Sequence, residues 1–489
     1  MTAASNSINP VQIAICIAIT LLIAIFTAIK VRRDNKGGTG SSKDVFLANG
    51  GLSWFFIAGS ITLTNLSTDQ LVGMNGNQML LLAWWEIAGF FGLLILAFVF
   101  VPVYYRNNCT TVTELLERRY GGRSIRTLVS ALFLFGIVLI YLPAGLYSGG
   151  LFLQSLFGAD IPIIVFAAIL GIIAAAYTML GGLRAVAIMD TYAGVGVLTI
   201  ALLIVALALA AVNFDITSNM PAERLTMFGA KDSPIPFHTL FTGMIFIQIF
   251  YWSTNQPITQ KAMAAPTVRE AQKGVLAAAT IRILIIPAIV VVPGVVAYKL
   301  FGDVGDAAYG RLVAQVLPDW LSGIFAALIA GAVIAHTSAV LNSAVALYSV
   351  DFHDPFIAPV TNHWRIAAIV SAIIITSSIA LVPLYQNAAS IINLLQQLNG
   401  LASMPILSAF IVGLLFRGVS ASAAVTGVIW GVLLYGTFTF VLEPAKLITL
   451  HYIDFMVITL FSSVGVALGV NRFILGNRAR FVGLRTVDA

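Results

Sequence analysis

Charge is what this sequence has least of. Only 9% of its 489 residues are Asp, Glu, Lys or Arg, whereas soluble domains carry about 25%. Hydrophobic residues make up 59% of the chain, which excludes a disordered protein as well as an ordinary soluble one. Cysteine occurs only at Cys16 and Cys109, so a disulfide framework is excluded. The apolar runs are long and continuous rather than alternating, which excludes a transmembrane β-barrel and predicts an all-α integral membrane protein.

About 20 apolar residues are needed for a helix to cross a bilayer, and the sequence contains about thirteen such stretches. The predicted spans are 10–30, 53–80, 81–105, 124–157, 160–181, 186–212, 238–260, 273–298, 319–350, 365–383, 387–416, 422–441 and 450–471. Residues 10–30 lack the cleavage pattern of a signal peptide, so we expect them in the mature protein. The connections are too short for a soluble domain, and the chain is expected to form a single transmembrane domain.

The basic residues are distributed unevenly between the two sides of these spans. Of the 26 Lys and Arg residues, 20 fall on one side and five on the other. Because cytoplasmic loops are enriched in Lys and Arg, we expect the N-terminus outside and the C-terminus in the cytoplasm, in an inner or plasma membrane. The net charge of +6 therefore reflects membrane orientation and does not indicate nucleic-acid binding. No motif indicates an oligomeric state.

Polar residues are concentrated in the middle of two spans. The second span contains a concentration of polar residues between Thr62 and Asn77, and the seventh contains one from Gln248 to Gln260 that includes Pro257. Such side chains compete for backbone hydrogen bonds, and proline removes a backbone donor. We therefore predict a broken helix in each span, the second break lying near Ser253–Asn255. The alternatives are a continuous polar-faced helix in the first case and a simple proline kink in the second.

The two interrupted spans lie five spans apart and so enter the membrane from opposite sides. This spacing predicts two inverted five-helix repeats, residues 53–212 and 238–416. Paired broken helices are typical of secondary transporters, which bind solute near the bilayer midplane. No metalloprotease, nucleophile-elbow, phosphate-loop or Cys/His ligand motif is present, so an enzyme is not expected. A channel and a non-transporting membrane solute sensor stay as alternatives.

Charged and amide side chains also occur within other spans. Glu86 and Arg282 could face one cavity and partly neutralise each other, since ionisable groups at this depth are costly. The alternatives are an interfacial acid for Glu86 and a snorkelling side chain for Arg282. Gln396 and Gln397 could instead hold two helices together.

Several motifs resemble the solute:sodium symporter family, which includes the sodium–glucose and sodium–galactose cotransporters. The stretch from Thr64 to Gly73 is similar to the first broken helix of that family. Residues 181–186 followed by Asp190 resemble its GGLxAV…D signature, and residues 251–265 resemble its YWxxNQxxxQRxLAA motif. Leu341-Asn342-Ser343 also fits. The resemblance covers roughly residues 45–416. It implies the LeuT-type inverted-repeat fold of five plus five helices, with flanking helices at 10–30 and 422–471.

The resemblance also implies a nearly complete sugar site. The matching positions are Asn65, Gln70, Glu86, Gln248, Tyr251, Trp252, Arg282 and Gln396. Acid, amide and guanidinium groups bond to hydroxyls, and an aromatic ring can stack on a pyranose. Tyr251 and Trp252 would gate this site from the cytoplasm. Arg282 stands where the sugar transporters have lysine, and a guanidinium favours carboxylates. We expect a neutral sugar or polyol first and a sugar acid as the alternative.

The sequence departs from this family at the expected sodium site. The resemblance implies sodium ligands from the backbone carbonyls of Leu63, Leu66 and Ala332, with Asp190 near the ion path. It also requires two adjacent hydroxyl side chains, and their positions hold Ala335 and His336. No cofactor is expected other than sodium as a coupling ion. Because histidine titrates near neutral pH, proton-coupled transport and uncoupled transport are alternatives to sodium-driven import, and a packed neutral histidine is a further one.

Overall fold

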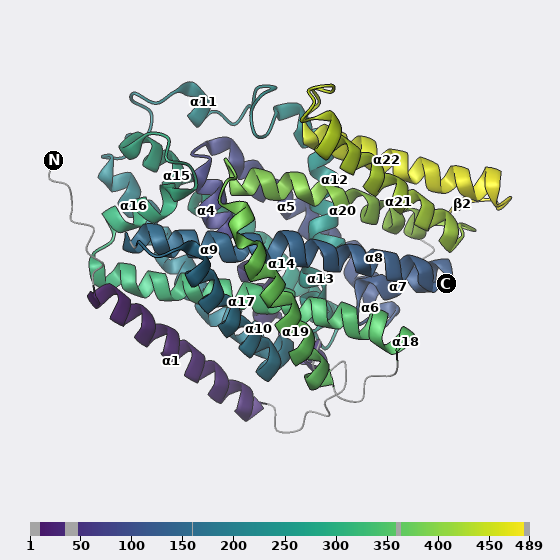
Figure 1. Ribbon diagram of the computed structural model, residues 1–489, viewed down its shortest axis with the longest axis horizontal. Helices are drawn as coiled ribbons and strands as arrows, with labels where there is room; N and C mark the ends of the chain where they lie inside the picture. The colour runs from purple at the N-terminus through teal and green to yellow at the C-terminus, as the bar shows by residue number, and fades with distance from the viewer. Residues whose placement is uncertain (1–9, 35–46, 159, 358–362, 484–489) are drawn as a thin grey trace.

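The computed structural model describes residues 10–34, 47–158, 160–357 and 363–483, except for the side chains of residues 23, 24, 26–34, 49, 180–186, 188–190 and 363. Nearly all of these residues are helical (Figure 1). The elements in the first part of the chain are α1 (Pro10–Asp34), η1 (Ala48–Gly50), α3 (Trp54–Asn65), α4 (Thr68–Gly76), η2 (Leu80–Leu82), α5 (Ala83–Ile95), η3 (Leu96–Phe100), α6 (Val101–Arg106), α7 (Val112–Tyr120), α8 (Arg123–Gly136), η4 (Ile137–Tyr141), α9 (Leu142–Phe157), α10 (Ile163–Ala211) and α11 (Ala222–Leu225).

The second part of the chain is equally helical and adds the two short strands. Its elements are η5 (Phe237–Phe241), α12 (Gly243–Ile249), η6 (Phe250–Thr254), α13 (Gln256–Met263), α14 (Val268–Leu284), α15 (Ile286–Phe301), η7 (Gly305–Ala307), α16 (Ala308–Val316), α17 (Asp319–Leu347), η8 (Tyr348–His353), α18 (Asp354–Phe356), α19 (His363–Leu381), η9 (Val382–Tyr385), α20 (Ile391–Leu415), β1 (Phe416–Arg417), α21 (Ala421–Thr437), η10 (Phe438–Leu442), α22 (Tyr452–Gly469), η11 (Val470–Ile474) and β2 (Arg480–Phe481).

The all-α membrane architecture predicted from the sequence is confirmed. Within the described ranges, nine helices are long and apolar enough to cross a membrane, and two shorter apolar helices accompany them. The count of thirteen spans is not confirmed. Where the sequence predicted separate spans at 160–181 and 186–212, the helical assignment continues through both as α10. The predicted spans 53–80 and 238–260 are absent from the nine because each is interrupted.

Both predicted helix breaks are present. The first separates α3 from α4 at Leu66 and Ser67, where Ser67 is extended with ψ 172°. In the second, α12 continues through the π-helical turn η6 and ends at Asn255, which is extended with ψ 123°. Pro257 lies in the first turn of α13, where its missing N–H removes no helical hydrogen bond. The proline therefore starts a new helix and does not merely kink an existing one.

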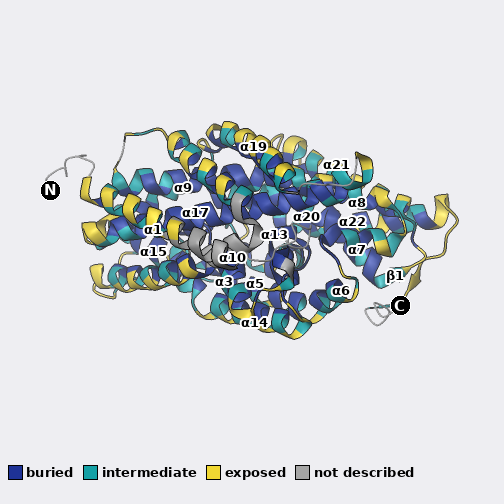
Figure 2. Ribbon diagram, turned by 90° about the horizontal axis from the view of Figure 1, so that it is seen from below, coloured by how far each residue is buried: buried dark blue, intermediate teal, exposed yellow. Residues whose placement is uncertain are grey.

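Helix α17 forms the centre of the bundle. In its most apolar 18-residue window 89% of the residues are buried, and it packs against α1, α3, α9 and α10. Figure 2 shows the buried residues concentrated along this central region, with exposed residues on outer helices such as α14 and α19. A helix that is apolar on all sides belongs in the interior of a large bundle. The broken helix α3–α4 packs directly on this buried centre.

A compact contact joins the end of α4 to the loop before α16 and to the start of α20. The Asp306 carboxylate accepts a 2.9 Å hydrogen bond from the Ile391 backbone N–H. A Cβ atom at Gly76 would lie 2.4 Å from Asp306 Oδ1, so this approach requires glycine. Burial raises the pKa of Asp306 to about 6. The contact lies at the end of the bundle opposite β1 and β2 (Figure 1).

Candidate solute-binding site

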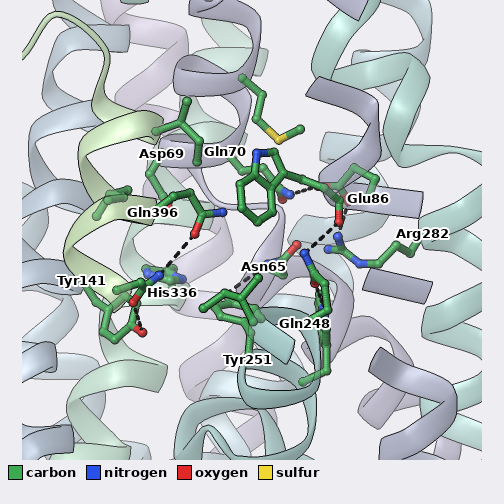
Figure 3. A pocket seen from close by; sticks show the side chains of 17 residues that line it. Asn65, Asp69, Gln70, Glu86, Tyr141, Gln248, Tyr251, Arg282, His336 and Gln396 are labelled. Atoms are coloured by element: carbon green, nitrogen blue, oxygen red, sulfur yellow. Dashed lines mark hydrogen bonds and ion pairs between the residues drawn. The ribbon is translucent and has the colours of Figure 1, made fainter. Parts of the chain in front are cut away.

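A cavity of about 70 Å³ lies beside the two helix breaks. All eight residues that the sequence singled out for solute binding line it, and so does His336. Figure 3 shows these side chains converging from α3, α4, α5, α12, η6, α14, α17 and α20. The cavity is smaller than the roughly 300–1,000 Å³ of pockets that enclose drug-sized ligands, so a solute of that size requires the surrounding groups to separate.

Glu86 and Arg282 form a buried ion pair across this cavity. Arg282 Nη1 donates to Glu86 Oε2, and the side chains are 4% and 0% exposed. Gln70 Nε2 donates to the other oxygen of Glu86, Oε1. Arg282 also lies over the Trp252 ring, with 4.3 Å from its guanidinium carbon to the ring centroid. The expected pairing of Glu86 with Arg282 is thus present, and the interfacial and snorkelling alternatives are wrong.

Two glycines of α5 allow Trp252 to reach this ion pair. A Cβ atom at Gly89 would lie 3.0 Å from Trp252 Nε1, and one at Gly92 would lie 2.6 Å from Trp252 Cδ1. Trp252 Nε1 donates to Gln248 Oε1 at 2.9 Å, and Gln248 Nε2 donates to the Trp85 carbonyl at 3.3 Å. The close packing of α5 against α12 and η6 therefore fixes the positions of both the indole and the amide.

The hydrogen bonding of the site leaves three buried polar atoms unused. Asn65 Nδ2 donates to Tyr251 Oη at 3.0 Å, but Asn65 Oδ1 has no partner. Gln70 Oε1 and Arg282 Nη2 are also buried without a partner. A buried polar group without a hydrogen bond costs roughly 1–3 kcal/mol. These two acceptors and one donor are therefore available to a polar solute.

The opposite wall of the cavity contains residues that the sequence analysis did not select. Tyr141 Oη donates to Asn399 Oδ1 at 2.5 Å, and Asn399 Nδ2 is 3.4 Å from Gln396 Oε1. Asn399 follows Gln396 by three residues and so shares its helix face, a signal that could have identified it. Tyr141 and Asp69 also line the cavity, but Tyr141 lies in an apolar run and gave no such signal. Gln397 instead donates to Glu443.

At the expected sodium site, a histidine bonds to the end of the broken helix. His336 Nδ1 lies 2.7 Å from the carbonyl oxygen of Thr64. A carbonyl can only accept, so Nδ1 carries the hydrogen. Thr64 lies between Leu63 and Leu66, whose carbonyls were expected to bind sodium. The other two expected positions, Ala332 and Ala335, are fully buried on α17. The side chain of Asp190 lies outside the described residues.

Lys261 is one of the 20 basic residues that the sequence places on the cytoplasmic side. In the structure its side chain is fully buried. Its Nζ donates to the Ser60 carbonyl at 3.0 Å and to the Thr64 hydroxyl. The C-terminal end of a helix attracts positive charge. Lys261 and His336 therefore both place N–H donors on the end of α3, where its carbonyls leave the helix.

Comparison with known proteins identifies the family. The Sodium:solute symporter family matches residues 45–431. The chain belongs to this family. It is 33% identical over 461 residues to the uncharacterized symporter YidK of Escherichia coli (strain K12), covering 89% of this chain and 80% of YidK. It is 28% identical to the sodium/glucose cotransporter of Vibrio parahaemolyticus, covering 84% of this chain and 82% of that protein.

A solved structure confirms the fold. The structure of a Na⁺-coupled sialic acid symporter, in a substrate-bound outward-open state, superposes with a TM-score of 0.82. The sequence identity is 18%, and the match covers 97% of this chain and 100% of that one. The LeuT-type fold expected from the motifs is therefore confirmed. This chain is therefore a multi-pass membrane transporter of a small molecule and not an enzyme. Its family suggests sodium as the coupling ion.

Proposed function

We propose that this symporter imports a neutral sugar or polyol by alternating access. The observation that carries the proposal is the buried pair of Glu86 and Arg282. Because the two charges compensate each other, this wall of the cavity offers no net charge to a solute. The partnerless atoms of Asn65, Gln70 and Arg282 supply the acceptors and the donor that hydroxyl groups require.

A sugar acid fits this arrangement less well. Arg282 Nη1 is already engaged by Glu86, and a solute carboxylate would place two negative groups against one guanidinium. Like charges that share a site disfavour one another. Asp69, which also lines the cavity, adds a further acidic group. These contacts support a neutral solute although Arg282 replaces a lysine.

Uptake into proteoliposomes tests this proposal. Labelled glucose, galactose and myo-inositol would be compared with glucuronate and sialic acid, and we expect uptake of at least one neutral compound and none of the acids. Gln396→Ala removes an amide that lines the cavity, and we expect uptake to fall about tenfold, as for the loss of about 1.4 kcal/mol. Gln397→Ala is the matched control, because Gln397 bonds to Glu443 instead. Uptake of acids alone, or equal losses in both variants, would contradict the proposal.

We propose a sodium gradient as the driving force, which the family membership supports. The bond between His336 and Thr64 favours a second candidate, in which a proton on the imidazole replaces the metal ion. Imidazole is a poor ligand for sodium, which prefers oxygen. Uptake would be measured with a sodium gradient, with a proton gradient and with neither. Accumulation with sodium supports the first candidate, and accumulation only with protons supports the second. Equilibration without accumulation would exclude both.

The direction of import rests on the predicted topology, with the N-terminus outside and the C-terminus in the cytoplasm. We further propose that residues 53–212 and 238–416 act as the two inverted repeats that rearrange around the site. Cysteines would be introduced at exposed positions of the two ends, such as Phe228 and Phe481, and intact cells would be treated with an impermeant thiol reagent. Labelling at Phe228→Cys and not at Phe481→Cys is expected, and the reverse would invert the topology.

A further inference from the structure

Residues 221–228, in the connection between α10 and η5, bind the end of α4 and the start of α5. Arg224 Nη1 donates to the carbonyl of Asn77, the residue directly after α4, at 3.0 Å. Three residues further along the chain, the Met227 carbonyl accepts a 2.8 Å hydrogen bond from Trp84 Nε1. The short helix α11 of this segment lies at the top edge of the view in Figure 1, with α4 and α15 beneath it. We call residues 221–228 the strap.

Three groups hold the Arg224 guanidinium, and its side chain is only 11% exposed. Besides the Asn77 carbonyl it binds the Asp303 carboxylate, with 3.1 Å between Nη2 and Oδ2. Its guanidinium carbon lies 4.3 Å from the centroid of the Tyr298 ring. An ion pair, a carbonyl and an aromatic face together fix the planar guanidinium in one position. Because the C-terminal end of a helix attracts positive charge, Arg224 fastens the end of α4 to the end of α15.

The side chain of Asn77 bonds to the start of α20. Its Nδ2 donates to Ser390 Oγ at 3.1 Å, and its Oδ1 accepts from Asn393 Nδ2 at 3.3 Å. Ser390 also caps α20, because its Oγ accepts from the Asn393 backbone N–H. The contact between Asp306 and Ile391, the first residue of α20, lies beside these bonds. We call the bonds of Asn77 to Ser390 and Asn393 the amide clasp.

The amide clasp lies about one helical turn from the solute cavity. On α4, Asn77 follows Met74 by three residues, and Met74 lines the cavity. On α20, Asn393 lies between Ile392 and Gln396, which both line the cavity as well. Residues three apart share a helix face. The clasp therefore joins two walls of the cavity on its side facing the end of the bundle opposite β1 and β2.

We propose that the amide clasp is a gate of the solute cavity and that Arg224 is the positioning residue of this gate. The clasp closes the path between α4 and α20, and Arg224 holds Asn77 where its amide reaches α20. Opening the gate exchanges neutral hydrogen bonds for bonds to water, which costs little free energy. The ion pair of Arg224 with Asp303 persists during opening, so the end of α4 stays placed for closing again. This inference deepens the proposed function, because it rests on alternating access.

Thiol labelling of the purified full-length protein in detergent tests this role. Met74→Cys combined with Cys16→Ala and Cys109→Ala leaves one thiol, in the wall of the cavity, and its reaction with a hydrophilic maleimide reports opening. Arg224→Gln is expected to raise the labelling rate about tenfold. Arg224→Lys keeps the charge but loses the planar fork, so an increase of about threefold is expected. Arg311→Gln is the matched control, because Arg311 is exposed on α16 outside the clasp.

A second variant shows whether Arg224 acts through Asn77. Asn77→Ala removes the clasp itself and is also expected to raise the labelling rate about tenfold. If Arg224 acts by placing Asn77, the two changes together should label no faster than the faster single variant. The native Cys109, 5% exposed between α6 and α7, serves as a second reporter in chains that keep Met74. Its labelling rate reports a general loosening of the fold and should not rise in Arg224→Gln.

Each outcome of this labelling decides the proposal. Faster labelling at position 74 in Arg224→Gln and Asn77→Ala, without a further increase in the combined variant, supports it. Equal rates in Arg224→Gln and Arg311→Gln overturn it, and so do multiplied effects in the combined variant or faster labelling of Cys109. If Arg224→Gln does not fold, Asp303→Asn replaces it, because this change removes the same ion pair at an exposed position. The assay contains neither solute nor gradient, so its failure is distinct from a failure of the proposed solute or coupling ion.

Discussion

Two regions beside the first helix break differ in how they relate to the family. We call the first region the substrate half, and it consists of polar side chains that bond to one another. Its residues, on α4, α5, α12, η6 and α14, are Gln70, Glu86, Gln248, Trp252 and Arg282. We call the second region the ion half, and it lies on α3 and α17. Its residues are Thr64, Ala332, Ala335 and His336, and the last two occupy the positions where hydroxyl side chains were expected. The two halves draw mostly on different helices. Solute recognition and ion coupling can therefore change independently.

The largest expected effect comes from breaking the ion pair of the substrate half. Glu86→Gln leaves Arg282 buried without a counter-charge, which typically costs 3–5 kcal/mol. We expect a marked fall in the unfolding temperature and loss of uptake. Glu86→Gln combined with Arg282→Gln removes both charges, so its loss of stability should be smaller than the sum of the single losses. Additive losses in the unfolding temperature would show that the two side chains do not interact.

A smaller effect is expected from crowding the substrate half. A Cβ atom in Gly92→Ala would lie 2.6 Å from Trp252 Cδ1 and 2.7 Å from the Gln248 carbonyl. Overpacking of this kind costs roughly 1–3 kcal/mol, and the KM for solute should rise while the ion dependence stays the same. Gly465→Ala is the matched control, since its Cβ would meet nothing within 4 Å. Unchanged kinetics in Gly92→Ala would mean that the indole position is unimportant.

Introducing the two expected hydroxyls tests whether the ion half determines the response to sodium. Ala335→Ser with His336→Ser adds the oxygens that sodium prefers and removes the bond to Thr64. We expect the apparent affinity for sodium in uptake to rise on the order of tenfold. Ala326→Ser adds the same hydroxyl to a buried alanine of the same helix, nine residues from Ala335, and serves as the control. An unchanged sodium response in the double variant would count against the assigned positions.

The smallest expected effect is a pH dependence of uptake that arises from the Asp306 carboxyl, which lies outside the ion half. Burial raises the pKa of Asp306 from 3.8 to about 6, so the packed arrangement binds the proton more tightly than the open one. The buried packing of the Asp306 side chain is therefore most stable below about pH 4 and loses this stability as the pH rises through 6, whereas the hydrogen bond from Ile391 favours the ionised carboxylate. We expect a few-fold change in uptake over that interval. Asp306→Asn should abolish this part of the pH profile, and an unchanged pH profile in that variant would contradict the assignment to Asp306.

The sequence predicted those features that stand out chemically in an apolar chain. Glu86 and Arg282 could be selected because charges within a membrane span are rare and costly, and Pro257 marked the second break. The burial of Lys261 was not predicted, because a basic residue near the end of a span is usually exposed to the cytoplasm. Tyr141 was missed because tyrosine in an apolar run is ordinary. The difference between Gln396 and Gln397 depends on which side of α20 faces the cavity, and that is decided by packing between distant helices.

The internal compensation of Glu86 by Arg282 has an electrical consequence. Moving one elementary charge through a membrane potential of 100 mV involves about 2.3 kcal/mol. Because this pair carries no net charge, its displacement during the conformational cycle adds nothing to the work done against the potential. A neutral solute bound beside it adds nothing either. Any steady current measured during transport would therefore report the movement of the coupling ion alone.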